Sequence, residues 1–85
     1  MKKVTMYSTE NCPYCVMAKG LLRKKKVDID ELRIDIDPKY IDEAIIKSGG
    51  RKTVPQIFIG DYHIGGYDDL CAIDDKGELD PLLKG

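Results

Sequence analysis

The stretch ENCPYCVMAK, residues 10–19, places Cys12 and Cys15 two residues apart, with a proline and a tyrosine between them. The chain has three cysteines in all, and an odd number argues against a framework of structural disulfides. Such disulfides are also rare in reducing compartments, where a CxxC pair is redox-active or binds a metal. The segments on either side of the motif favour the first of these two interpretations.

A strand is predicted directly before the motif and a helix directly after it. Residues 3–8, KVTMYS, alternate apolar and polar side chains, as a half-buried strand does. Pro13 suits the first turn of a helix, and residues 14–26 are rich in helix-forming residue types. The helix residues expected to pack in the core are Ala18, Leu21 and Leu22. Cys12 therefore falls where the strand ends and the helix begins.

The rest of the chain predicts an α/β protein with a small mixed sheet. Apolar and charged residues alternate in ELRIDIDP (31–38) as in an edge strand, whereas PQIFIG (55–60) carries the continuous apolar run of a central strand. The elements predicted after the first helix are an edge strand at 32–36, a helix from Pro38 capped by Asp37, a central strand at 55–60, a strand at 62–64 and a last helix after GGYDD. The order β-α-β-α-β-β-α predicts a four-stranded mixed sheet with helices on both faces, whose first two strands are parallel.

Size and charge exclude several classes of function. Eighty-five residues make a single domain, 1–85, and the net charge of −1 lacks the basic excess that nucleic-acid binding needs. The N-terminal MKKVTMYSTE lacks the apolar stretch of a signal peptide, and no apolar run is long enough to span a membrane. We therefore expect a cytoplasmic monomer that binds neither nucleic acid nor membrane.

The positions of the two cysteines predict different roles for them. The free amides and the positive dipole end at the start of a helix favour an anion, so Cys12 is expected to form a thiolate more readily than a free cysteine. Cys15 lies one turn deeper on the same side of the helix, where it can attack a mixed disulfide formed at Cys12. Cys12 is therefore the predicted nucleophile and Cys15 the predicted resolving thiol.

Four motifs along the chain resemble those of a known family. They are CPYC at 12–15, TVPQIFI at 53–59, IGGYDDL at 64–70 and LDPLL at 79–83. In their order and spacing, which run the whole length of the chain, the sequence resembles the dithiol glutaredoxins, most closely the small bacterial type. The resemblance implies a thioredoxin fold and an oxidoreductase that reduces protein disulfides and glutathione mixed disulfides. It implies glutathione as co-substrate, no metal and no tightly bound cofactor, with ribonucleotide reductase as a candidate protein partner.

The resemblance also implies a glutathione site beside the cysteines. Val54 would offer its backbone to the cysteinyl part of glutathione in the manner of an added strand, and Pro55 would follow a cis peptide bond. Thr53 would flank the same site, and the ring of Tyr14 would line the groove. Tyr67 is expected to be only a packing or rim residue.

The GGYDD segment would bind the γ-glutamyl end of glutathione. Glycines such as Gly66 let the backbone pass close to a ligand, and free amides at the start of the last helix suit its α-carboxylate. Asp69 is expected to bind the ammonium group, while Asp68, also counted in the site, is expected to be the N-cap of the helix. The candidates for the glycyl carboxylate, which equally fit a solvated loop end, are Arg51, Lys52 and Gln56.

The sequence departs from the family pattern at Thr9. Many glutaredoxins carry a lysine three residues before the nucleophile, where its charge favours the thiolate and a glutathione carboxylate. A threonine at this position predicts weaker glutathione binding or slower turnover near neutral pH.

Three alternative functions and one unexplained cysteine remain. Cys12, Cys15, His63 and Cys71 are the ligands of a conceivable zinc site, although their spacing is not that of a zinc module. Some glutaredoxins hold an iron–sulfur cluster between two subunits, but Pro13 and the second cysteine resemble the redox-active members. A dedicated electron donor to one enzyme is the third alternative. Cys71, at the predicted third position of the last helix, is expected to be a partly buried filler or else an exposed thiol open to glutathionylation.

Overall fold

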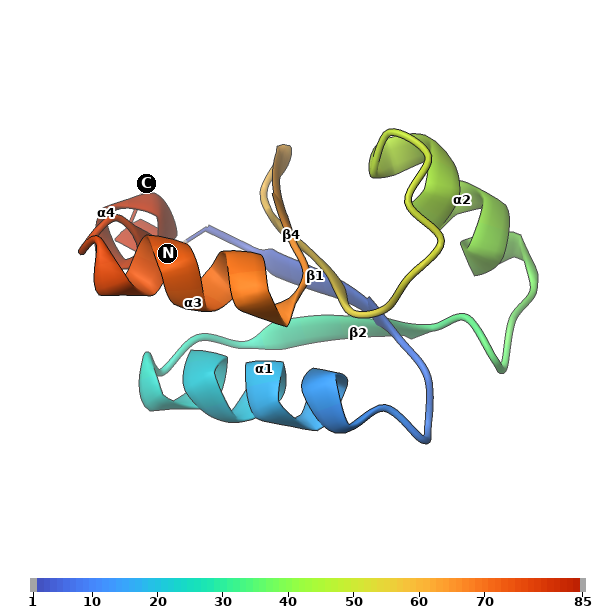
Figure 1. Cartoon of the computed structure of the whole chain (residues 1–85), viewed down its shortest axis with the longest axis horizontal. Helices are drawn as coiled ribbons and strands as arrows, with labels where there is room; N and C mark the ends of the chain where they lie inside the picture. Colours follow the sequence, from blue (N-terminus) through green and yellow to red (C-terminus); the bar gives the residue numbers. More distant parts are fainter. Residues whose placement is uncertain (1, 85) are drawn as a thin grey trace.

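The structure is a computed structural model that describes residues 2–84 of the chain. Within this range four strands and four helices follow one another (Figure 1). Their bounds are β1 Val4–Ser8, α1 Pro13–Lys24, β2 Ile29–Arg33, α2 Lys39–Lys47, β3 Gln56–Ile59, β4 Tyr62–Gly65, α3 Tyr67–Asp75 and α4 Leu79–Lys84. None of the helices described is long and apolar enough to cross a membrane.

The strands form one mixed sheet in the order β2-β1-β3-β4. β1 runs parallel to β2, to which α1 connects it. It runs antiparallel to β3, which is itself antiparallel to β4. The predicted four-stranded mixed sheet, its parallel first pair and the edge position of the second strand are confirmed.

The second strand lies earlier in the sequence than the alternating residues predict. β2 ends at Arg33, which pairs with Ser8, the last residue of β1. Beyond this point β1 offers no partner for a ladder, and the N–H groups of Ile36 and Asp37 both donate to the Arg33 carbonyl at 3.2 Å in a turn. The predicted strand over 32–36 is therefore wrong, and Ile36 is 70% exposed. Local alternation cannot show where the neighbouring strand ends.

Helices cover both faces of the sheet, and each face has its own apolar cluster. Because side chains alternate along a strand, Ile57 and Phe58 of β3 point to opposite faces. Ile57 belongs to the larger cluster, together with Leu22 of α1 and Leu70 of α3. Phe58 belongs to the smaller cluster, together with Ala44 of α2. Helix α1 and helix α2 therefore lie on opposite faces of the sheet (Figure 1), as the sequence predicts.

Helix α3 begins earlier than predicted. Its first residue is Tyr67 and its N-cap is Gly66, so the predicted N-cap at Asp68 is wrong. Glycine has no side chain with which to cap the helix, and the Asp69 carboxylate instead accepts the Gly66 N–H at 2.9 Å. Cys71 is consequently the fifth residue of the helix and not the third.

The start of α2 and the presence of a fourth helix also differ from the sequence prediction. Helix α2 begins at Lys39 and its N-cap is Pro38, so the predicted start at Pro38 and cap at Asp37 are one residue too early. The Asp37 carboxylate still accepts the N–H of Lys39 at 3.2 Å, beside the start of the helix. Helix α4 was not predicted as a helix. It buries Leu79 and Leu83, and the Leu83 carbonyl accepts the Lys2 N–H at 2.9 Å, so the two ends of the described chain lie together (Figure 1).

Candidate active site

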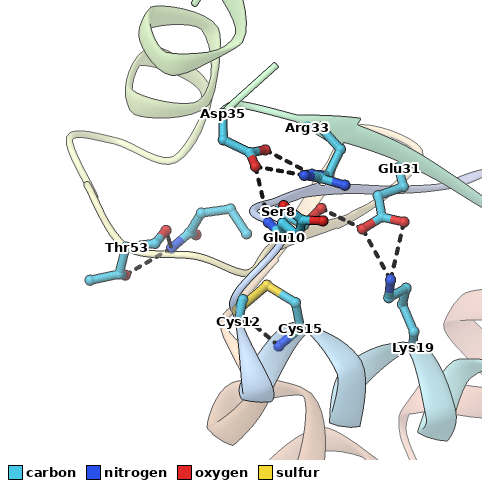
Figure 2. The surroundings of a disulfide bond; sticks show 10 residues. Ser8, Glu10, Cys12, Cys15, Lys19, Glu31, Arg33, Asp35 and Thr53 are labelled. Carbon is cyan, nitrogen blue, oxygen red and sulfur yellow. Dashed lines mark hydrogen bonds and ion pairs between the residues drawn. A yellow bond between two sulfur atoms is a disulfide. The ribbon is translucent and has the colours of Figure 1, made fainter. Parts of the chain in front are cut away.

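The two cysteines lie at the junction of β1 and α1. Cys12 is the N-cap of α1, with extended backbone (φ −131°, ψ 95°), and Pro13 is the first helical residue. A disulfide joins Cys12 to Cys15, whose Cα atoms are 5.2 Å apart (Figure 2). The Cys15 N–H donates to the Cys12 Sγ at 3.0 Å. The chain that leaves β1 places Cys12 at the N-terminal start of α1, and the first helical turn brings Cys15 against it.

The surroundings of Cys12 favour negative charge on its sulfur in the reduced protein. The first turn of α1 carries no acidic residue, while Arg23 and Lys24 lie in its last turn. The N–H that reaches Cys12 Sγ belongs to the positive end of the helix dipole. Cys12 is 7% exposed, whereas Cys15 is 1% exposed. Cys12 is thus both the more accessible sulfur and the one closer to the free amides.

A groove of about 430 Å³ lies beside the cysteines, between the start of α1, the segment before β3 and the start of α3. The lining does not include Lys52 or Gln56, two of the candidates for the glycyl carboxylate. Seven other residues of the predicted glutathione site line the groove: Tyr14, Thr53, Val54, Pro55, Gly66, Asp68 and Asp69. The peptide bond between Val54 and Pro55 is cis, as the family resemblance implies. Residues that are far apart in the sequence therefore meet in one place.

Arg51 also lines the groove, where it pairs with a residue of the predicted site. Its guanidinium lies 3.2 Å from the Asp69 carboxylate. The hydrogen bond from the Gly66 N–H is the main cause that lowers the pKa of the Asp69 carboxyl, and the Arg51 guanidinium lowers it further. Gln56, another candidate for the glycyl carboxylate, is fully buried, and its amide donates to the Thr53 carbonyl at 3.0 Å. Gln56 therefore supports the wall of the groove and is not placed to touch a ligand.

Tyr67, expected to be only a packing or rim residue, lines the groove. Its ring stacks on that of Tyr14, with centroids 6.2 Å apart and planes 30° apart. The thiol of the half-buried Cys71, one turn further along α3, raises the pKa of the Tyr67 hydroxyl. The two tyrosines form an aromatic wall across the groove. The only sign in the sequence that Tyr67 lines the groove is its position directly after two glycines.

A polar cluster that the sequence did not reveal lies near the buried end of the cysteine pair (Figure 2). The Ser8 hydroxyl donates to Glu31 at 2.5 Å, and the Lys19 ammonium lies 3.2 Å from both oxygens of the same carboxylate. Burial alone raises the pKa of Glu31, but the hydrogen bonds from Ser8 and Lys19 outweigh it and lower that pKa. The cluster ties α1 to β2 one helical turn beyond Cys15.

A second ion pair holds the loop that leads into Cys12. The Arg33 guanidinium contacts the Asp35 carboxylate at 2.6 Å, and this carboxylate also accepts the N–H of Glu10 at 3.2 Å (Figure 2). The hydrogen bond from Arg33 is the main cause that lowers the pKa of Asp35 to about 2. The loop is thereby fixed to the end of β2.

The alternative zinc site is not assembled. Residues 2–84 contain no group of three or more His, Cys, Asp or Glu side chains that could hold a metal ion. His63 instead hydrogen-bonds to Gln56 at 2.7 Å and stacks on Phe58, with centroids 4.7 Å apart. Burial, followed by the charge of Arg51, lowers the pKa of His63.

A cysteine pair closed across one helical turn can pass between dithiol and disulfide with little movement of the backbone. On this mixed sheet, a thioredoxin fold, the pair defines the chain as a thiol–disulfide oxidoreductase. Comparison with known proteins gives the family. The glutaredoxin family model matches residues 4–64, and the chain belongs to the glutaredoxin family.

Relatives match the chain over nearly its whole length. It is 55% identical to glutaredoxin 3 of Escherichia coli strain K12 over 84 residues, which cover 99% of this chain and 100% of that protein. Among solved structures, glutaredoxin from Brucella melitensis has a TM-score of 0.84 and 46% identity, covering 99% of this chain and 90% of the other. A buckwheat glutaredoxin–glutathione complex has a TM-score of 0.86 and 30% identity, covering 98% of this chain and 77% of the other.

Proposed function

We propose that this oxidoreductase takes its electrons from glutathione and reduces protein disulfides and glutathione mixed disulfides. The observation that carries the proposal is the groove beside Cys12, which offers a peptide backbone at Val54 and a charged end at Asp69. Glutathione is a short peptide with charged ends, so it matches both features. The buckwheat relative, with the same fold, was solved as a complex with glutathione.

In the proposed mechanism Cys12 makes the first bond. Its thiolate attacks one sulfur of a substrate disulfide, forms a mixed disulfide and releases the other sulfur as a thiolate. With a protein disulfide, the Cys15 thiolate then attacks Cys12 Sγ, which leaves the substrate as a dithiol and the enzyme as the Cys12–Cys15 disulfide. Two glutathione molecules return the enzyme to the dithiol and leave as glutathione disulfide. With a glutathione mixed disulfide, Cys12 alone suffices.

The groove residues divide the work of holding glutathione. The Val54 backbone pairs with the cysteinyl unit, Tyr14 covers it, and Thr53 flanks it. The free amides after Gly66 bind the γ-glutamyl carboxylate, and Asp69 binds the neighbouring ammonium.

Arg51 changes partner when glutathione binds. Its guanidinium contacts the Asp69 carboxylate in the structure. The ligand's ammonium takes over this carboxylate, and the guanidinium is then free to bind the glycyl carboxylate. Asp68, in the same helical turn, adds negative charge near the ammonium.

Other expectations about the protein stay predictions. They are a single domain, a monomeric state, a cytoplasmic location, the absence of metal and of any tightly bound cofactor, and protein substrates such as ribonucleotide reductase.

The test is glutathione-dependent reduction of a small glutathione mixed disulfide, coupled to glutathione reductase and NADPH. Cys12→Ser is expected to lose activity by more than a thousandfold, because no other group supplies the nucleophile. Cys15→Ser is expected to keep most of this activity but to lose reduction of protein disulfides. Cys71→Ser is the matched control and should behave as wild type. A wild-type protein without turnover would overturn the proposal, as would activity that survives Cys12→Ser.

A further inference from the structure

A small apolar notch lies next to the redox groove, on the side of α2. It has a volume of about 140 Å³ and is lined by Ile34, Ile41, Ala44, Ile45, Arg51, Lys52, Thr53 and Val54. The two basic residues contribute their aliphatic stems to such a lining and keep their charges in water. An apolar cavity of about 150 Å³ holds one benzene molecule, so the notch has room for one large apolar side chain.

The notch adjoins the redox groove. Arg51, Thr53 and Val54 line both of them. A segment that extends along Val54 therefore passes from the cysteines directly to the mouth of the notch.

The two faces of the sheet determine which residue of a bound segment reaches the notch. The cysteines lie at the start of α1, which packs on one face, whereas α2 packs on the other. In an extended segment that pairs with Val54, successive side chains point to opposite faces. If the reacting cysteine points to α1, its immediate neighbours point to α2. In the proposed glutathione orientation, the residue after the cysteine is the one on the Arg51 side.

Glutathione leaves this notch empty, because its residue after the cysteine is glycine. We propose that the notch binds the side chain that directly follows the reacting cysteine of a protein substrate, and that it selects substrates with a large aliphatic side chain there. This inference rests on the proposed function, since it uses the pairing with Val54. It adds a preference among protein disulfides that glutathione itself cannot report.

The reaction that reveals the preference is a single turnover. The reduced enzyme attacks a disulfide between two copies of one peptide, giving a Cys12–peptide mixed disulfide and one peptide thiol. Cys15 then releases the second peptide thiol. The peptide disulfide gains two electrons, and the Cys12–Cys15 dithiol loses them.

The experiment compares symmetric disulfides of acetyl-Ser-Cys-Leu-Ser-amide and acetyl-Ser-Cys-Ala-Ser-amide. Stopped flow gives the second-order rate constant with fully reduced enzyme, divided by that with dithiothreitol to correct for intrinsic reactivity. Burial of the extra methylene groups predicts a rate about tenfold higher for the leucine peptide. A ratio within twofold of one would overturn the proposal. No glutathione is present, so this outcome is independent of the coupled assay.

Two variants on α2 locate the preference. Ile41 lines the notch and is 41% exposed, and Ile41→Ser is expected to reduce the leucine-to-alanine ratio to about one to three. Ile46 lies on the same helix but is 78% exposed and outside the notch, so Ile46→Ser should keep the wild-type ratio. Each ratio is taken within one protein, and circular dichroism checks that both variants fold.

A permuted peptide, acetyl-Leu-Cys-Ser-Ser-amide, tests the position of the side chain. It is expected to react at the rate of the alanine peptide. An equal gain from this peptide would contradict the proposal, as would a leucine preference that survives Ile41→Ser, because both would place the apolar contact elsewhere.

Discussion

Two helices begin at the groove, and they satisfy their first amides in opposite ways. At α1 the side chain of the N-cap residue, Cys12, accepts the N–H of Cys15, three residues on. At α3 the N-cap is Gly66, and the residue three positions on, Asp69, sends its carboxylate back to the Gly66 N–H. Each helix thus uses one half of a capping box.

The difference sets the charge at each end of the groove. α1 has no acid in its first turn, so its positive end is left for the sulfur of Cys12. α3 carries Asp68 and Asp69 in its first turn, so that end offers both carboxylates and backbone amides. The first helix start suits an anion and the second a group with both charges, such as the amino-acid end of glutathione. The residues in the first turn of each helix therefore decide whether its start binds an anion or a group that carries both charges.

Removing the charge at the start of α3 is the strongest way to break this contrast. Asp69→Asn keeps an oxygen that can accept the Gly66 N–H but loses the partner of the ligand's ammonium. A hydrogen bond to a charged group contributes about 1.5–3 kcal/mol, so the KM for glutathione should rise roughly 10- to 100-fold. The coupled assay measures KM and kcat separately, and kcat should change less.

Asp68→Asn is the matched control for this prediction. It removes the same charge from the same helical turn but leaves the Asp69 carboxylate on Gly66. We expect its KM to stay within about threefold of wild type, since exposed charges interact weakly. Equal losses in the two variants would mean that total charge, and not the capping carboxylate, binds the ammonium.

Adding positive charge near α1 should sharpen the contrast. Thr9→Lys restores the lysine that many family members carry, and its ammonium should lower the pH at which Cys12 forms its thiolate. Turnover near neutral pH is expected to rise about two- to fivefold, consistent with an exposed charge pair of up to 1 kcal/mol. Absorbance of the thiolate at 240 nm gives the titration midpoint. Thr9→Gln, similar in reach but uncharged, should titrate as wild type, and an unchanged midpoint in Thr9→Lys would refute the role given to this position.

The sequence predicted those parts of the molecule that depend on neighbours along the chain. Local signals include the CPYC motif, the proline at the start of α1 and the apolar run of β3. The structure contains the helix and the strand that these signals predict. The groove residues came from a resemblance in motif spacing, and the structure brings Tyr14, the segment 53–55 and the start of α3 together in one groove. Local pattern plus family motif was therefore enough for the architecture and the outline of the site.

The failed strand prediction and the missed polar contact depend on partners far along the chain, whereas the failed cap prediction depends on the local backbone conformation. β2 ends at Arg33 because β1 ends at Ser8, which no alternation in 32–36 can reveal. Asp68 and Asp69 have equal capping propensity, and only the extended backbone of Gly66 decides between them. The contact of Ser8 with Glu31 joins two strands through their register, so the sequence gives no sign of it.

Adding negative charge to α1 should make it resemble α3. Val16 is 61% exposed near the start of the helix and lies outside the groove lining, so Val16→Glu introduces an acid without removing a contact there. Like charges four residues apart on a helix repel each other by about 0.2–0.5 kcal/mol, so the pH at which Cys12 forms its thiolate should rise by about 0.1–0.4. Alkylation by iodoacetamide across pH measures it. Val16→Gln should not differ from wild type, and an equal rise there would assign the effect to bulk.

The smallest expected effect is a difference in acid sensitivity between the two helix starts. The Gly66 N–H, followed by Arg51, lowers the pKa of Asp69 in the folded protein below its unfolded value of about 4. Between these two pKa values the unfolded chain binds more protons, so the free energy of unfolding falls as the pH decreases. The contribution of Asp69 is complete above about pH 4 and is lost as the pH drops through the lowered value. The first turn of α1 has no acid and should add no such dependence.

Urea unfolding of wild type and Asp69→Asn, followed by circular dichroism at pH 6, 4 and 3, isolates this effect. Other carboxylates with lowered pKa values, Glu31 and Asp35 among them, titrate in both proteins and cancel in the difference. The difference in unfolding free energy should therefore shrink toward pH 3, because protonated Asp69 no longer offers a charge to Gly66 and Arg51. A difference that stays constant down to pH 3 would show that the charge of Asp69 contributes nothing to the cap. The two helix starts would then differ in ligand charge alone and not in how they are stabilised.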